Sequence, residues 1–127
     1  MTKKARHVSL ACYGLPDISM PAIRRYARQI AERFKPDKII LFGSFAYGEP
    51  NEHSDVDLLV VMKCSNETSQ AVRIRTVFEA PFPLDLIVRT PKRLQRRIKE
   101  GNWFLRDVTE KGTVLYEKRN RKMAAKG

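Results

Sequence analysis

The chain has 127 residues, of which 43% are hydrophobic, and a formal net charge of +11 at pH 7. This length suits one domain with its own core, and no apolar run approaches the ~20 residues of a membrane-spanning helix, which argues against a disulfide-stapled miniprotein and a membrane protein. The positive charge predicts an anionic partner such as a nucleotide, a nucleic acid or an acidic protein surface.

The first segment, residues 1–18, has no clear periodicity, and one short strand is predicted near Val8 to Cys12. Its apolar part is too short and too interrupted by polar residues for a secretory signal. We therefore expect a cytoplasmic protein that does not interact with membranes.

From Ser19 onward the patterns of helix and strand become clear, because apolar residues recur with helical spacing in some segments and continuously in others. In chain order we expect a helix from Ser19 to the Lys35-Pro36 break, a strand at 38–42, a short helix or turn at 43–48, a strand at 55–62, a helix at 67–79, a strand at 84–88, helices from Thr90 to Gly101 and from Asn102 to about Lys111, and a strand at 113–117.

This alternation predicts an α/β (α+β) fold, a small mixed β-sheet flanked by helices. We expect one domain over residues 19–117 and a mobile basic tail at 118–127. Trp103 and Phe104 are expected to pack into the core.

The cysteines and histidines carry no pattern of a site. Cys12 and Cys64 lie far apart without CxxC spacing, and His7 and His53 have no neighbours that would orient them. Packing thiols and solvated imidazoles are predicted.

Two aspartates stand one residue apart at the start of the strand 55–62. Side chains on a strand alternate between its faces, so Asp55 and Asp57 emerge on the same face. Hard carboxylate oxygens are the ligands that Mg²⁺ prefers, and two such ions can clamp a phosphoryl group during in-line displacement. This arrangement predicts a site for divalent ions.

Asp85 likewise interrupts the apolar strand 84–88. If the two strands are neighbours, Asp85 would be a third metal ligand and could accept a proton from an attacking hydroxyl. A single aspartate of this kind is more often a turn residue or a surface ion-pair partner, but three together favour the site.

Gly43 and Ser44 directly follow the strand 38–42, where free backbone N–H groups and a hydroxyl could hold phosphate oxygens. Most Gly-Ser pairs of this kind are only turns, and the chain has neither a Walker-type nor a Rossmann-type glycine loop. The pair gains weight because Ser44 stands eleven residues before Asp55.

The segments GSFAYG, SDVDLLVV and LDLIV together resemble the GSx₁₀DxD pattern, with a third strand carboxylate, of the DNA polymerase beta-like nucleotidyltransferase superfamily. The short chain resembles its minimal nucleotidyltransferase (MNT) branch, and the resemblance spans about residues 23–116. It implies a mixed sheet flanked by helices. The implied activity is the Mg²⁺-dependent transfer of a nucleoside monophosphate from an NTP, usually ATP, to a hydroxyl acceptor.

This resemblance also implies a role for each motif residue. Gly43 and Ser44 would hold the NTP phosphates, Asp55 and Asp57 would bind the two Mg²⁺ ions, and Asp85 would join one ion and help to activate the acceptor.

One departure from the family pattern is visible in the GSxAxG segment. Many members of the branch carry an arginine there, whereas this chain has Phe45 and Tyr47. A cation that faces the phosphates is therefore missing from this segment or supplied from elsewhere.

Three functions remain open. The first is a nucleotidyltransferase that, as the resemblance suggests, modifies a HEPN-type toxin protein and acts as its antitoxin. The second is a non-catalytic antitoxin module that binds a nucleotide or the partner. The third is RNA modification, because 13 Lys or Arg stand against four acids from Arg89 onward. A solvated helix face is the preferred explanation of that charge, since aromatic residues do not interleave with it.

Overall fold

A computed structural model describes residues 18–51 and 53–118 of the chain. Its centre is a four-stranded sheet in the order β3-β2-β1-β4. Strand β1 runs antiparallel to both β2 and β4, and β2 runs parallel to β3. The strands are β1 (Lys38–Phe42), β2 (Val56–Val61), β3 (Leu84–Arg89) and β4 (Thr113–Glu117). The mixed sheet expected from the sequence is confirmed.

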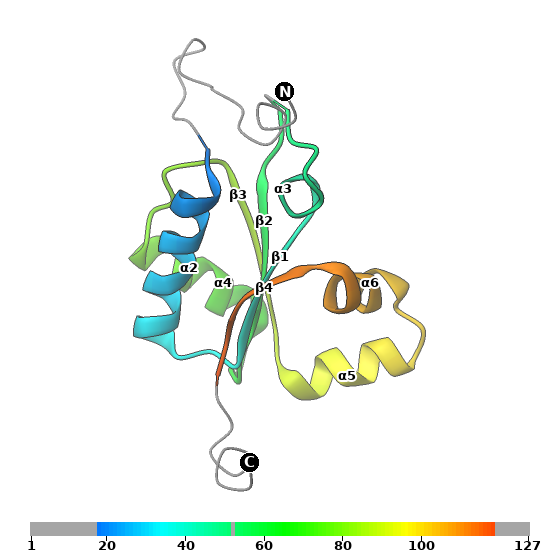
Figure 1. The fold of residues 1–127 in the computed structure, drawn as a ribbon. Coiled ribbons are helices and arrows are strands. Elements are labelled where there is room, and N and C mark those ends of the chain that lie inside the picture. The colour runs from blue at the N-terminus through cyan, green and yellow to red at the C-terminus, as the bar shows by residue number, and fades with distance from the viewer. Residues whose placement is uncertain (1–17, 52, 119–127) are drawn as a thin grey trace, which may run out of the picture.

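Helices cover both faces of the sheet, as Figure 1 shows. On one side lie α2 (Met20–Phe34) and α4 (Glu67–Val77), and on the other lie α5 (Pro91–Lys99) and α6 (Trp103–Lys111). The short α3 (Ser44–Tyr47) connects β1 to the loop before β2. None of the helices in this described part of the chain is both long enough and apolar enough to cross a bilayer.

Each longer helix begins at the cap that its sequence provides. The side chains of Ser19, Asn66, Thr90 and Asn102 accept hydrogen bonds from backbone N–H groups in the first turns of α2, α4, α5 and α6. Such caps satisfy N–H groups that have no partner within the helix. Local side-chain chemistry therefore sets where these helices start.

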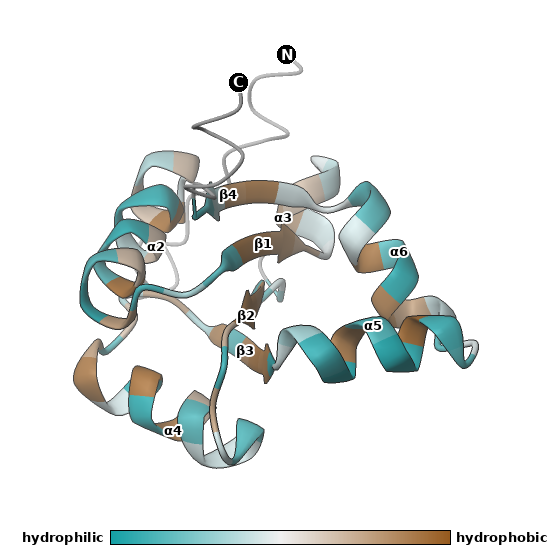
Figure 2. Cartoon of the chain, turned by 90° about the horizontal axis from the view of Figure 1, so that it is seen from below, coloured by the Kyte–Doolittle hydropathy of each residue, from teal (hydrophilic) through white to brown (hydrophobic). Residues whose placement is uncertain are grey.

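The strands carry a hydrophobic core on each face of the sheet. Leu58 and Val60 point into the larger core, toward α2 and α4, whereas Leu59 and Val61 point into the smaller core under α5 and α6. Figure 2 shows that β1 and β2 are hydrophobic along most of their length, while α5 alternates between hydrophilic and hydrophobic residues. A strand buried on both sides reads as a continuous apolar run, which explains KIILF and VDLLVV.

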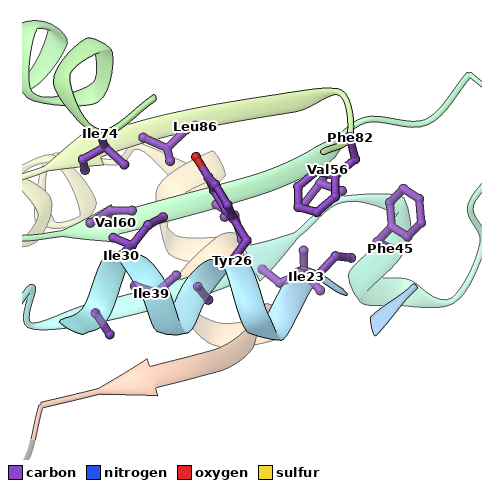
Figure 3. Close-up of a cluster of buried hydrophobic side chains, with 14 of the residues drawn as sticks. Ile23, Tyr26, Ile30, Ile39, Phe45, Val56, Val60, Ile74, Phe82 and Leu86 are labelled. Atoms are coloured by element: carbon purple, nitrogen blue, oxygen red, sulfur yellow. The ribbon is translucent and has the colours of Figure 1, made fainter. Parts of the chain in front are cut away.

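Tyr26 crosses the larger core from α2 (Figure 3). Its ring packs edge-on against Phe82 at a centroid distance of 5.6 Å, and its hydroxyl donates to the carbonyl of Phe78 at 2.7 Å. Burial raises the pKa of the Tyr26 hydroxyl to about 12. The hydroxyl therefore stays protonated and remains a hydrogen-bond donor inside the core.

The observed elements differ from the expected ones in small ways. Strand β2 begins at Val56 rather than at Asp55, β3 continues to Arg89, and α4 ends at Val77. Cys64 is a free, half-buried thiol, and His53 is exposed. The strand predicted at Val8–Cys12, with His7, and the tail beyond Lys118 lie outside the described residues.

The prediction that Trp103 and Phe104 pack into the core is wrong. Trp103 is 74% exposed and Phe104 is 43% exposed. Helix α6 is held instead by Leu105 and Val108, which point into the smaller core. Both residues stand at the start of the helix, where the ring of Phe104 meets Phe42 of β1 edge-on and stays half-exposed.

We expect Leu58→Ala to lower the free energy of unfolding by about 2–5 kcal/mol, because the side chain is fully buried in the larger core and its removal leaves a cavity. Val72→Ala is the control, because Val72 is exposed on α4 and its truncation should change stability by less than about 0.5 kcal/mol. Urea unfolding followed by circular dichroism measures both. Equal losses would contradict the placement of Leu58.

Candidate active site

The end of β1 and the beginnings of β2 and β3 meet at one edge of the sheet. Asp57 on β2 pairs in register with Phe42 on β1 and with Asp85 on β3. Residues in register on neighbouring strands project from the same face, so the side chains of Asp57 and Asp85 stand side by side. This is the face of the sheet that carries the smaller core, and Asp57 precedes Leu59, the first residue of β2 in that core.

Asp55 lies one residue before β2 and is exposed, as is Asp85, whereas Asp57 is half-buried. Desolvation, followed by the negative charges of Asp85 and Asp55, raises the pKa of Asp57 to about 6. The structure thus places the three predicted carboxylates near enough to repel one another. A cation among them would relieve that repulsion.

Gly43 brings the turn after β1 against this carboxylate group. Its backbone has a φ of 80°, and a Cβ on it would overlap the Oδ2 atom of Asp57. Only glycine combines this conformation with such a close approach. The Asp57 carboxylate therefore lies directly on the backbone of the Gly-Ser turn.

Ser44 is joined to the loop that leads into β2. Its hydroxyl donates to the hydroxyl oxygen of Ser54 at 3.0 Å, and that oxygen also accepts the backbone N–H of Asn51 at 2.8 Å. Because Ser54 directly precedes Asp55, this hydrogen bond holds the Ser44 side chain close to the start of the DVD segment. The sequence interpretation did not single out Ser54, although its position directly before DVD was the available signal.

The two residues at the arginine positions of the family pattern point in different directions. Phe45 is buried in the larger core, where Figure 3 shows it near Val56, while Tyr47 is exposed on α3. Phe45 serves the packing of α3 on the sheet. Neither side chain brings a positive charge to the carboxylates.

The three carboxylates suit a hard divalent cation by their chemistry. Within residues 18–51 and 53–118, no three His, Cys, Asp or Glu side chains converge closely enough to form a ready-made metal cluster. Asp55 and Asp85 are exposed, however, and burial with their negative charges raises the pKa of Asp57. Oxygen ligands completed by water and substrate phosphates are what Mg²⁺ prefers.

The chain is similar to known nucleotidyltransferases. A family model described as a nucleotidyltransferase domain matches residues 23–116. The candidate protein adenylyltransferase MJ0604 of Methanocaldococcus jannaschii is 31% identical over 98 residues, which cover 75% of this chain and 95% of the relative. A second candidate protein adenylyltransferase of that organism, MJ1215, is 40% identical over 38 residues, which cover 30% of this chain and 44% of the relative.

One solved structure is also similar. It is the crystal structure of a candidate nucleotidyltransferase from Sulfolobus solfataricus, with 22% sequence identity and a TM-score of 0.48. The match covers 60% of this chain and 70% of that one.

We expect Gly43→Ala to lower stability more than Gly48→Ala does. At Gly48, which is left-handed with φ 79° and ψ 20°, alanine costs about 1–2 kcal/mol of backbone strain. Gly43, with φ 80° and ψ −164°, lies in a region that is essentially restricted to glycine, and a Cβ there would also meet the side chain of Asp57. Urea unfolding of the two variants measures the difference. Equal losses would contradict the close approach of Gly43 and Asp57.

The raised pKa of Asp57 predicts how the stability of the fold changes with pH. Its usual value is 3.8 and its value in the fold is about 6, so the folded protein keeps a proton that the unfolded chain releases. Ionisation of Asp57 therefore disfavours folding, with no effect below about pH 4 and the full effect above about pH 6.

Asp57→Asn should accordingly raise the thermal midpoint at pH 7.5 without divalent ions, and this gain should shrink toward zero near pH 4. Added Mg²⁺ should stabilise the original protein at pH 7.5 and reduce the difference. Differential scanning calorimetry at the two pH values measures both effects. A lower midpoint for Asp57→Asn at pH 7.5 would contradict the repulsion among the carboxylates.

Proposed function

Because the chain belongs to the nucleotidyltransferase domain family and is a nucleotidyltransferase, we propose that it transfers AMP from ATP to a hydroxyl acceptor with the help of Mg²⁺. The observation that carries this proposal is the register of Asp57 and Asp85 on neighbouring strands, with Gly43 against Asp57. It joins a phosphate-binding turn to a pair of carboxylates in one place.

Each motif residue has a role in this reaction. Asp55, Asp57 and Asp85 would hold the divalent ions, which when bound would stabilise the charge that develops on the phosphates. The Ser44 hydroxyl, oriented by Ser54, binds a phosphate oxygen. Gly43 presents no side chain, so its backbone leaves room for the Asp57 carboxylate beside the phosphates.

Asp85 is exposed at the start of β3, where an acceptor can reach it. One of its oxygens takes the proton from the acceptor hydroxyl. The acceptor oxygen then forms a bond to the α-phosphorus while the bond from that phosphorus to the bridging oxygen of the β-phosphate breaks. Pyrophosphate leaves with the electron pair of the broken bond.

The acceptor that we propose is a protein hydroxyl. Support comes from the names of the related proteins, which describe candidate protein adenylyltransferases. On the family resemblance, the partner is a HEPN-type toxin protein in the cytoplasm, and the chain acts as its antitoxin. The catalytic domain would span residues 19–117, with the net charge of +11 suited to an acidic partner surface.

One observation favours a second candidate, a non-catalytic antitoxin that binds its partner. Phe45 is buried and Tyr47 is neutral, so this segment provides no cation to the phosphates. Loss of such a charge removes part of the stabilisation that phosphoryl transfer depends on. Slow or absent turnover would follow.

Transfer of label from α-labelled ATP to a partner protein, with Mg²⁺, separates the two candidates. Asp57→Asn and Asp85→Asn should each lower the rate by about 100-fold or more, because one removes a metal ligand and the other the proton acceptor. Asp107→Asn is the control, since Asp107 lies on α6 and pairs with Lys111 at 3.2 Å. Tyr47→Arg, at an exposed position, should raise the rate.

Label transfer that is unchanged in Asp57→Asn would refute catalysis at this site. Neutralisation of a toxin partner to the same extent by Asp57→Asn and by the original protein would favour the non-catalytic antitoxin instead.

A further inference from the structure

Phe104 is a half-exposed aromatic residue that packs against Phe42, the register partner of Asp57. Its ring meets that of Phe42 edge-on, with centroids 5.7 Å apart and an interplanar angle of 80°. Phe42 is only 8% exposed beneath it, whereas Phe104 remains 43% exposed. A half-exposed aromatic ring of this kind offers a π-face on which a nucleotide base can stack.

The contact with Phe42 links Phe104 to the carboxylate group. Phe42 is the register partner of Asp57, and the Cβ atoms of such partners lie about 4.5–5.5 Å apart. Phe104 therefore contacts the residue that neighbours Asp57, the carboxylate that we assign to the metal ions. In a nucleotide, one ribose separates the base from the α-phosphate. A base on Phe104 and phosphates near Asp57 would be separated by a similar span.

Packing of α6 does not account for the open side of Phe104. Leu105 and Val108 bury this helix against the smaller core, and Asn102 caps it. Phe104 lies one helical turn before Val108 and therefore continues the face of α6 that looks toward the sheet. Its ring meets Phe42 of β1 there, and the rest of the ring stays open to solvent.

We propose that Phe104 is the stacking platform for the base of the nucleotide, an inference that rests on the proposed function. The exposed side of the ring binds the base while Ser44 and the metal ions bind the phosphates. Aromatic stacking accepts any base because every base has a π-face, so the platform adds affinity with little selectivity between ATP and GTP.

Trp103 is the natural control because it neighbours Phe104 in the sequence but points elsewhere. Successive side chains on a helix differ by about 100° in direction. Trp103 is 74% exposed, and the ring that meets Phe42 is that of Phe104. A general effect of exposed aromatic surface would be seen at both positions, whereas base stacking would be seen only at Phe104.

The experiment compares two ligands that share their phosphates, ATP and inorganic tripolyphosphate, both with Mg²⁺. Titration calorimetry is done on the original protein and on Phe104→Leu, Phe104→Trp and Trp103→Leu. Leucine keeps an apolar cover on Phe42, and tryptophan keeps a stacking surface. Circular dichroism and the thermal midpoint show that each variant is folded.

Phe104→Leu should weaken ATP binding by about 5- to 150-fold, the range expected from the loss of one stacked base, and should change tripolyphosphate binding by less than about twofold. Phe104→Trp should retain ATP affinity, and Trp103→Leu should leave both ligands unaffected.

Unchanged ATP affinity in Phe104→Leu would overturn the platform alone, and so would an equal loss for ATP and tripolyphosphate. A raised KM for the protein acceptor with unchanged ATP affinity would assign Phe104 to acceptor docking and also overturn the platform. If the original protein binds neither ligand with Mg²⁺, the proposed function fails together with the inference.

Discussion

The approach of the Asp57 carboxylate to the backbone of Gly43 is the constraint on which the site depends. It requires a residue without a side chain immediately after β1, in a conformation with a φ of 80° that other residues rarely adopt. It also requires the antiparallel register that pairs Phe42 with Asp57. A slip of one residue in that register would turn Asp57 to the opposite face, away from both the turn and Asp85.

The two hydrophobic cores cover β2 to different extents. The larger core holds α2 and α4 against one face and extends over the whole length of β2, from Val56 to Val60. The smaller core covers only Leu59 and Val61 of that strand. Asp57 comes next on the same face, so the carboxylates stand where the covering helices stop, within reach of solvent and substrate.

Local chemistry made most of the fold predictable, because caps such as Ser19 and Asn102 and the apolar periodicities act within a few residues. The parallel pairing of β2 with β3 is not a local property, and the grouping of Asp85 with Asp57 depended on assuming it. The exposure of Phe104 could not be predicted either, since hydrophobicity does not reveal where the neighbouring sheet ends. The role of Ser54 depends on a contact with Ser44 across the loop.

The same geometry limits how the site can bind a triphosphate. Burial, followed by the negative charges of Asp85 and Asp55, raises the pKa of Asp57 to about 6. The GSxAxG segment adds no compensating charge, because Phe45 is committed to the larger core and Tyr47 is neutral. A triphosphate approaching these carboxylates is repelled unless divalent ions come with it. Metal and nucleotide should therefore bind together.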